Sequence, residues 1–217
     1  MVKEIKNFLL NLLFPIICLG CKQENKNKEY LCFDCFKNLK FCGRHYNLNL
    51  EFIDEITIAG DYEDKILMAL IKILKFNSIA QVGIILAKFL CLFWQGRALI
   101  APQKFLVIPI PLSKRRERKR GFNQAEIIAH YFANYFNYGL NLDLKKIKNT
   151  LAQSSLKENR RQENIIDAFS WTGENLNKKN IILIDDVITT GATINEAAKI
   201  LKKAGAKKII ALAIAKG

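Results

Sequence analysis

The fold is decided by one stretch, Ile181-Ile182-Leu183-Ile184-Asp185-Asp186-Val187-Ile188-Thr189-Thr190-Gly191-Ala192-Thr193. It reads as a buried strand, then two adjacent acids, then a loop with hydroxyl groups, then a helix. Parallel sheets bind ligands at the carboxyl ends of their strands, which is where Asp185 and Asp186 are expected. The two carboxylates can accept hydrogen bonds from hydroxyl groups, as on a ribose. The loop offers backbone N–H groups, threonine hydroxyls and a helix N-terminus to a phosphate.

An ordinary strand–loop–helix connection is the alternative, with Thr193 as the helix N-cap and both acids solvated. A two-acid loop alone would favour that alternative. Here every position of a long pattern is filled, and Gly191 lets the backbone approach a ligand closely. We therefore predict a cradle for a ribose and its phosphate.

The rest of the chain alternates apolar strands with amphipathic helices. We expect strands at residues 53–59, 105–110, 142–147, 180–184 and 208–215, and helices at residues 65–74, 79–92, 124–138 and 192–204. The alternation predicts an α/β fold, in which a parallel sheet is covered by helices on both faces. A chain of 217 residues suffices for one such domain and a small appendage. We place the domain at residues 46–217 and the appendage at residues 1–45.

Four of the six cysteines form two pairs, Cys18-x-x-Cys21 and Cys32-x-x-Cys35. A CxxC turn places two thiolates on one metal ion, and two pairs supply the four ligands that structural zinc prefers. Thiol–disulfide chemistry is the alternative, but a redox CxxC usually stands alone at a helix start within a βαβ unit. The pattern therefore predicts a small zinc knuckle in a reducing compartment. Cys91 lies in an apolar helical pattern and is expected to be a packed thiol.

A cationic run, Lys114-Arg115-Arg116-Glu117-Arg118-Lys119-Arg120, follows the strand expected at residues 105–110. We interpret it as a basic loop that binds a pyrophosphate group, a nucleic-acid backbone or both, with Phe122 beside it to stack on a base. A solvated loop is the alternative. The formal net charge of +14 favours polyanionic partners, although it equally fits a lysine-rich proteome. The candidate nucleic-acid-binding residues are Arg115, Arg116, Arg118, Lys119, Arg120 and Phe122.

The N-terminal segment resembles a short signal peptide, because Lys3 and Lys6 precede an apolar run. Asn11 and Pro15 interrupt that run, and cleavage after it would destroy the first cysteine pair. The run is also too short to span a bilayer. We expect an amphipathic helix at residues 3–13 and a cytoplasmic protein, and leave open a peripheral position at the inner face of the cytoplasmic membrane.

Together these segments resemble the ComF family, proteins of natural transformation that are related to phosphoribosyltransferases. The resemblance is carried by the two CxxC pairs, Lys75-Phe76, Pro109-Ile110-Pro111, Arg120-Gly121-Phe122-Asn123-Gln124, the series Gln153, Leu156, Arg160 and Asn164, and residues 185–193. It implies a type I phosphoribosyltransferase-like parallel sheet that binds phosphoribosyl pyrophosphate (PRPP). Family members often carry a further cysteine pair, of which only Cys42 remains here.

The resemblance also assigns roles to individual residues. Asp185 and Asp186 would contact the ribose 2′ and 3′ hydroxyls, and residues 189–193 would hold the 5′-phosphate. Mg²⁺ would be bound by the pyrophosphate group of the ligand. The complete set of predicted PRPP-binding residues is Asp185, Asp186, Val187, Thr189, Thr190, Gly191, Ala192, Thr193, Lys75 and Arg120.

Two classes of function stay open at this point. An enzyme would displace pyrophosphate from PRPP at the anomeric carbon, with an acceptor and a catalytic base that the residues do not identify. A nucleic-acid-handling adaptor would keep the PRPP pocket as a sensor or a relic. A nucleobase-salvage enzyme is a weaker third hypothesis, because a small base needs neither a zinc knuckle nor a basic loop. The partners implied are single-stranded DNA and a helicase-like motor of DNA uptake.

Overall fold

The computed structural model describes residues 16–25, 27, 29–42, 48–77, 79–98, 104–148 and 165–217. The helix expected at residues 3–13, the domain boundary expected at residue 45, and Gln153, Leu156, Arg160 and Asn164 lie outside these ranges. Within them, no helix combines the length and the apolar character needed to cross a lipid bilayer.

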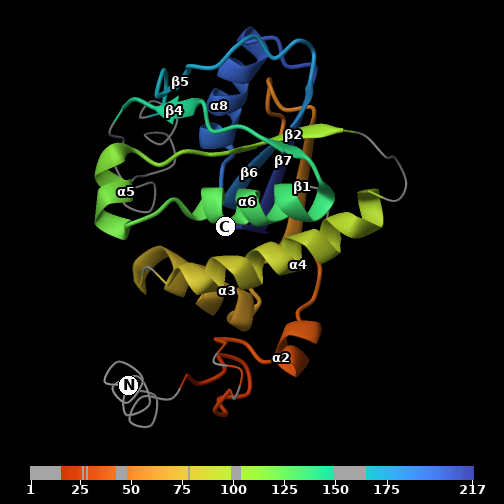
Figure 1. Ribbon diagram of the computed structural model, residues 1–217, viewed down its shortest axis with the longest axis vertical. Helices are drawn as coiled ribbons and strands as arrows, with labels where there is room; N and C mark the ends of the chain where they lie inside the picture. The colour runs from red at the N-terminus through yellow and green to blue at the C-terminus, as the bar shows by residue number, and fades with distance from the viewer. Residues whose placement is uncertain are drawn as a thin grey trace, which may run out of the picture.

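Five parallel strands form the central sheet, in the order β1-β7-β6-β2-β3 (Figure 1). The strands are β1 (Glu55–Asp61), β2 (Phe105–Pro109), β3 (Gly139–Leu140), β6 (Asn180–Ile188) and β7 (Lys208–Lys216). A separate antiparallel pair consists of β4 (Leu144–Lys146) and β5 (Phe169–Trp171). The parallel sheet confirms the predicted α/β class, and β4 confirms the strand expected at residues 142–147.

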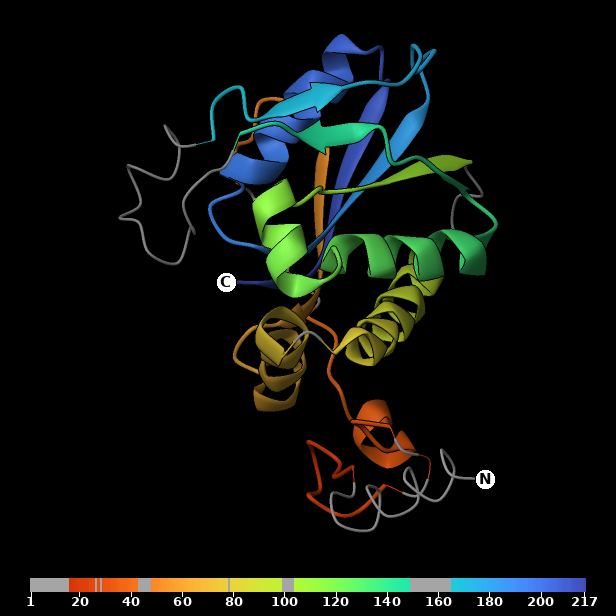
Figure 2. The same ribbon diagram turned by 60° about the vertical axis from the view of Figure 1, so that its left-hand side comes forward.

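Helices cover both faces of this sheet (Figures 1 and 2). The helices of the described residues are α2 (Phe33–Lys37), α3 (Lys65–Lys72), the π-helix η1 (Ile73–Asn77), α4 (Ala80–Ala98), α5 (Lys114–Arg120), α6 (Gln124–Phe136) and α8 (Ala192–Lys203). Of these, α4 and α6 lie on one face of the sheet and α8 on the other, while α2 belongs to the cysteine-containing segment. Ile182 and Ile184 of β6 pack in one core cluster with α3, α4 and α6. Ile181 and Leu183 pack in a second cluster with α8, β4 and β5. Successive strand side chains point to opposite faces, so a continuous apolar run is what a doubly covered strand requires.

The two acids lie inside β6 and not after it, which corrects the strand end expected at Ile184. Pairing with β7 continues beyond that residue, with Asp185 opposite Ala213 and Ile188 opposite Lys216. On the other side β2 stops at Pro109, which pairs with Ile184. The acids therefore extend past β2 at the carboxyl end of the sheet, the position where parallel sheets bind ligands.

The basic segment is a helix, which corrects the loop expected from its charge density. Arg, Lys and Glu are good helix formers, and this intrinsic preference prevails over the repulsion between neighbouring charges. Helix α5 begins after Ser113 and ends at Gly121, whose φ of 82° is the left-handed conformation that commonly terminates helices. Likewise, α8 begins after Gly191, also at φ 82°, so Thr193 lies within the helix and is not its N-cap.

The cysteine-containing segment contacts the helical layer of α3 and α4. Three of its residues are buried in the core cluster of those helices: Cys18, Leu31 and Leu39. The chain that leaves this segment joins the edge of the sheet, where the Cys42 N–H donates to the Ala59 carbonyl at 2.8 Å. The knuckle is thus anchored both by apolar packing and by backbone pairing to β1.

Candidate functional site

The strand period separates the two acids of β6. Asp186 shares the face of Ile184, is 7% exposed, and places its Oδ1 atom 3.0 Å from the Nζ atom of Lys75 in η1. Asp185 shares the face of Leu183 and accepts a hydrogen bond from the Asp186 N–H at 2.8 Å. Burial, and then the charge of Asp186, raise the pKa of Asp185 to about 7. Neighbouring carboxylates that repel each other resist joint ionisation unless cations lie near them.

Three cations interact with the pair, namely Lys75, Arg120 and Lys146, and a fourth, Arg116, lies near Arg120 and Lys146. They belong to three different elements, Lys75 to η1, Arg116 and Arg120 to α5, and Lys146 to β4. Burial lowers the pKa of both arginines, while the charges of Asp186 and Asp185 oppose that lowering at Arg120. Four cations against two acids leave a local excess of positive charge in a partly buried site. Such an excess favours a bound anion with several negative charges.

Lys146 belongs to this site, although the sequence did not single it out. Burial, reinforced by the charge of Arg116, lowers the pKa of Lys146 to about 8, and Asp185 partly opposes this. Its Nζ atom lies 5.2 Å from the centre of the Phe169 ring. A parallel bridge to Ser113, the residue before α5, brings Lys146 to the site. The one sequence feature that includes Lys146 is the short strand pattern at residues 142–147. That pattern does not show which groups the lysine side chains contact.

The loop after β6 forms a pocket next to Asp185. Every second residue of the predicted segment lines it, together with two isoleucines: Asp185, Val187, Ile188, Thr189, Gly191, Thr193 and Ile194. The hydroxyl oxygen of Thr190 instead accepts a hydrogen bond from the Ala192 N–H at 3.4 Å, within the loop itself. Two features favour glycine at position 191. Its φ is positive, and a Cβ there would lie 2.6 Å from a methyl carbon of Leu50. The pocket therefore combines a carboxylate, hydroxyls and the start of a helix.

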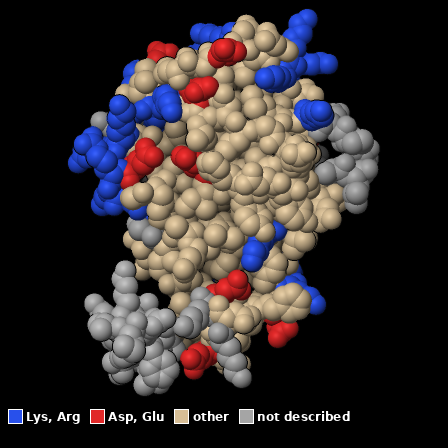
Figure 3. All heavy atoms as spheres, viewed as in Figure 1, with Lys and Arg blue, Asp and Glu red and all other residues tan. Residues whose placement is uncertain are grey.

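The predicted nucleic-acid residues do not share one environment. Arg116 and Arg120 are half-buried, and Arg120 lies near the acids, whereas Arg115, Arg118 and Lys119 are exposed. Figure 3 shows Lys and Arg gathered at the edge of the molecule where Figure 1 places α5. Phe122 packs partly buried against the core cluster of α4 and α6, which limits the ring surface that a base could reach. The structure brings Arg120 and Lys75 to the acids, but it separates the basic helix into an inner and an outer side.

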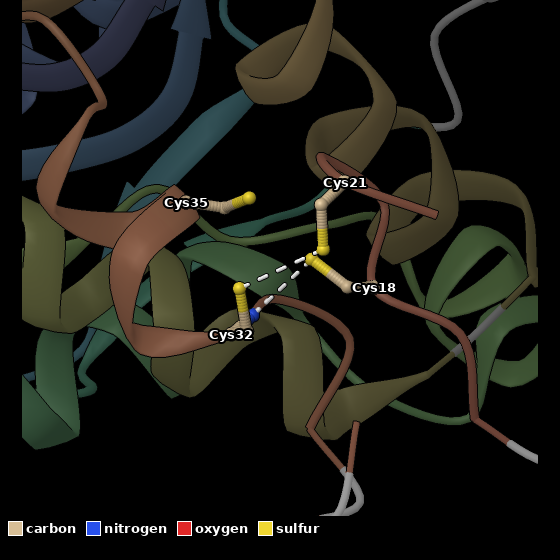
Figure 4. A group of neighbouring side chains, drawn as sticks. All are labelled: Cys18, Cys21, Cys32 and Cys35. Atoms are coloured by element: carbon tan, nitrogen blue, oxygen red, sulfur yellow. Dashed lines mark hydrogen bonds between the residues drawn. The ribbon is translucent and has the colours of Figure 1, made fainter. Parts of the chain in front are cut away.

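Four cysteine sulfur atoms converge in the N-terminal knuckle (Figure 4). The Sγ atoms of Cys18, Cys21, Cys32 and Cys35 all lie within 4.8 Å of one another. Zinc–sulfur bonds of about 2.3 Å in a tetrahedron place sulfur atoms roughly 3.8 Å apart, so the cluster can hold one such ion after small adjustments. A Cβ on Gly20 would lie 2.5 Å from the Cys35 Sγ, which explains a glycine inside the first CxxC turn.

The knuckle also favours a thiolate at Cys18. Although burial opposes ionisation, hydrogen bonds from the backbone N–H groups of Cys32, Cys21 and Gly20 lower the pKa of Cys18 to about 6. Burial and the neighbouring thiols raise the pKa of Cys35 to about 12. Each ionised sulfur therefore opposes ionisation of the next, and a cation at the centre relieves that conflict. Cys91 is buried in α4, as expected for a packed thiol.

Comparison with known proteins now gives the family. Competence protein F of Haemophilus influenzae is 31% identical over 201 residues, which cover 89% of this chain and 87% of that protein. The chain belongs to the ComF family. Residues 118–217 match the phosphoribosyl transferase domain family. DNA utilization protein YhgH of Escherichia coli strain K12 is 26% identical over 203 residues, covering 89% of this chain and 87% of that protein.

Among solved structures, the allosteric regulatory enzyme of purine biosynthesis aligns with a TM-score of 0.41 and 17% identity. That alignment covers 61% of this ComF-family chain and 26% of the enzyme. The family motif at residues 120–124 is largely structural here. Gly121 ends α5, and Asn123 starts α6 by accepting from the Ala125 N–H at 3.2 Å while donating to the Ile110 carbonyl at 3.0 Å. Only Arg120 of that motif reaches the acids.

Proposed function

We propose that this ComF-family protein binds PRPP at the carboxyl end of β6 and serves DNA uptake in natural transformation. The observation that carries the proposal is the cluster of Lys75, Arg120 and Lys146 around Asp185 and Asp186, with Arg116 beside Arg120 and Lys146. PRPP carries a ribose diol flanked by a phosphate and a pyrophosphate. A diol needs acceptors and the two anionic groups need cations and N–H donors, which is the combination of groups found here.

In this arrangement different structural elements of the protein bind different groups of PRPP. The carboxylates of Asp185 and Asp186 accept from the ribose hydroxyls, and the loop at residues 189–193 holds the 5′-phosphate at the start of α8. The four cations face the pyrophosphate. Mg²⁺ enters on the pyrophosphate oxygens, as hard cations do when they need few protein ligands. Among the described residues, the four cysteines are the only group of metal-ligating side chains close enough to hold an ion by themselves.

Phosphoribosyl transfer would follow from this binding mainly through positioning and charge stabilisation. An acceptor nucleophile forms a bond to the anomeric carbon while the bond from that carbon to the pyrophosphate oxygen breaks, and a proton that the acceptor loses passes to the departing pyrophosphate or to water. The leaving group gains negative charge, which the cations of η1, α5 and β4 stabilise in place. The fixed ribose supplies orientation. These residues therefore suit transfer chemistry, whatever the acceptor.

Calorimetry with PRPP and Mg²⁺, followed by a pyrophosphate-release assay, tests the proposal. We expect Mg²⁺-dependent binding by the purified protein. Release that is stimulated by single-stranded DNA would assign an enzyme that acts in DNA handling, and release stimulated by a free nucleobase would assign salvage. Binding without release would assign an adaptor that senses PRPP. Absence of binding at millimolar PRPP would contradict the proposed pocket.

A nucleic-acid role has an observation of its own, the exposed cationic side of α5. The relatives named for competence and for DNA utilization support the same direction. We propose single-stranded DNA as the polyanion, because phosphate contacts with lysine and arginine bind a backbone without reading its sequence. The helicase-like motor of DNA uptake, at the inner face of the cytoplasmic membrane, is the protein partner that we propose.

Because the pKa of Lys146 is lowered, we expect the protein to take up protons when it binds PRPP. This pKa is lowered to about 8, so near that pH about half of the side chains are neutral, and a bound anion restores the charged form. Calorimetry in two buffers of different ionisation enthalpy at this pH should show uptake of about half a proton from this residue. Lys146→Arg should bind PRPP with little of that uptake, because arginine stays protonated. Equal uptake by the wild type and Lys146→Arg would show that Lys146 does not face the ligand.

A further inference from the structure

Helix α5 presents two cationic sides that face different surroundings. With 3.6 residues per turn, Arg116 and Arg120 are four positions apart and lie within about 40° of each other around the helix axis. Four other cations occupy a sector of about 140° on the opposite side. These four are Lys114, Arg115, Arg118 and Lys119. One short segment therefore carries two sets of positive charges that point away from each other.

The inner side, Arg116 and Arg120, belongs to the acid site. Both guanidinium groups are half-buried, and burial lowers the pKa of each. Arg120 interacts with the charges of Asp185 and Asp186, while Arg116 lies near Arg120 and Lys146. A long strand of DNA cannot enter such a half-buried cluster without moving α5. A small anion such as pyrophosphate can.

The outer side has the opposite character. Its four cations are all exposed, and the one acid in the helix is Glu117. The Arg118 Nε atom donates to the Lys114 carbonyl at 3.3 Å, a bond that does not use its terminal amino groups. Figure 3 shows this edge as a dense group of blue side chains, with a few red acidic side chains next to it and mostly uncharged surface beyond them. This side suits a flexible polyanion that approaches from solvent.

We propose that α5 is a two-sided bridge that holds PRPP on its inner side and single-stranded DNA on its outer side at the same time. The PRPP half rests on the proposed function. The two anions are separated by the helix itself, about 10 Å across, which is close to the Debye length at physiological salt. Salt therefore reduces their mutual repulsion, and it screens the exposed strand more than the half-buried pyrophosphate. PRPP and DNA form one ternary complex and do not compete for the cationic segment.

Two sets of substitutions separate the sides. The outer variant is Arg115→Ala with Arg118→Ala and Lys119→Ala, and the inner variant is Arg116→Ala with Arg120→Ala. A matched control removes three exposed lysines, one before β6, one at the end of α8 and one before β7, namely Lys179→Ala with Lys203→Ala and Lys207→Ala. The outer variant and this control lose the same net charge, so they separate a local contact from a general effect of charge.

Fluorescence anisotropy of a labelled oligothymidine, measured from about 50 to 200 mM salt, reads the DNA side. Each phosphate contact on a single strand contributes a slope of about −0.7, so the outer variant should flatten the slope by about two units. The control should change it by less than about half a unit. Calorimetry reads the other side, where the inner variant should lose about tenfold or more in PRPP affinity and the outer variant less than about twofold.

A DNA titration of the wild type with saturating PRPP and Mg²⁺ decides the matter. We expect a dissociation constant for DNA within about threefold of the value without PRPP. Release of the oligonucleotide by PRPP, or equal slope losses in the inner and outer variants, would overturn the bridge in favour of one shared site. Absence of DNA binding would overturn the bridge and leave the PRPP pocket standing. Absence of PRPP binding, seen in the calorimetry without DNA, would remove the pocket itself and the bridge with it.

Discussion

A Cys18→Ser, Cys35→Ser double variant should lose its zinc completely, and the N-terminal segment should unfold. The four sulfur atoms lie within 4.8 Å of one another, and two ligands cannot hold the ion that relieves their charge. Structural zinc contributes about 10–16 kcal/mol in zinc-finger peptides, far more than the few apolar side chains of the knuckle can replace. Elemental analysis of the purified wild type should find one zinc per chain.

Two controls accompany the zinc measurement. Cys42→Ala and Cys91→Ala should each retain the metal, because neither residue belongs to the four-sulfur cluster. Limited proteolysis of the zinc-free variant should cut within residues 1–45 and spare residues 46–217, as the predicted domain boundary requires. A wild-type protein without zinc, or a double variant that keeps it, would contradict the knuckle. A disulfide between Cys18 and Cys21 in freshly prepared protein would do the same.

An Asp185→Ala, Asp186→Ala double variant should lose almost all PRPP affinity. Each ribose hydroxyl left without an acceptor in the bound state costs about 1–3 kcal/mol. The pair together corresponds to a loss of roughly 30-fold to more than 10⁴-fold, measured by calorimetry with Mg²⁺. Unchanged affinity would mean that the acids do not hold the ribose.

Inorganic pyrophosphate separates the ribose contacts from a general change of charge. The acids repel an anion, so their removal should leave pyrophosphate binding equal or stronger, because Lys75, Arg116, Arg120 and Lys146 remain. Weakened binding of both ligands would instead point to a collapsed site. Lys75 is the group to examine in that case, because the variant removes its carboxylate partner, 3.0 Å away in the wild type.

The parts of this protein that the sequence predicted correctly are those encoded by contiguous patterns. The apolar run before Asp185 identified β6 and the doubly covered sheet, because a strand with no solvent face needs apolar residues at every position. The CxxC pairs identified the sulfur cluster, since the turn geometry itself brings two thiols together. Both inferences needed only neighbouring residues.

Contacts between distant segments could not be predicted in this way. Lys146 reaches Asp185 because β4 bridges to Ser113, and no local pattern records that pairing. Likewise β6 continues past the acids because β7 pairs with it up to Ile188. The basic run appeared uniform in sequence, and only its helical form separates Arg116 and Arg120 from the exposed cations. In that segment helix propensity prevails over the repulsion between neighbouring charges.

Amide hydrogen exchange with and without PRPP and Mg²⁺ tests the central claim most directly, because it locates the ligand on the backbone of the unmodified protein. The account predicts slower exchange in two places, the loop at residues 189–193 and helix α5, because the 5′-phosphate accepts from the loop amides and the pyrophosphate fixes the helix. The cysteine knuckle should exchange at an unchanged rate. Protection confined to other segments, or no change at residues 189–193 when calorimetry shows PRPP bound, would contradict the site described here.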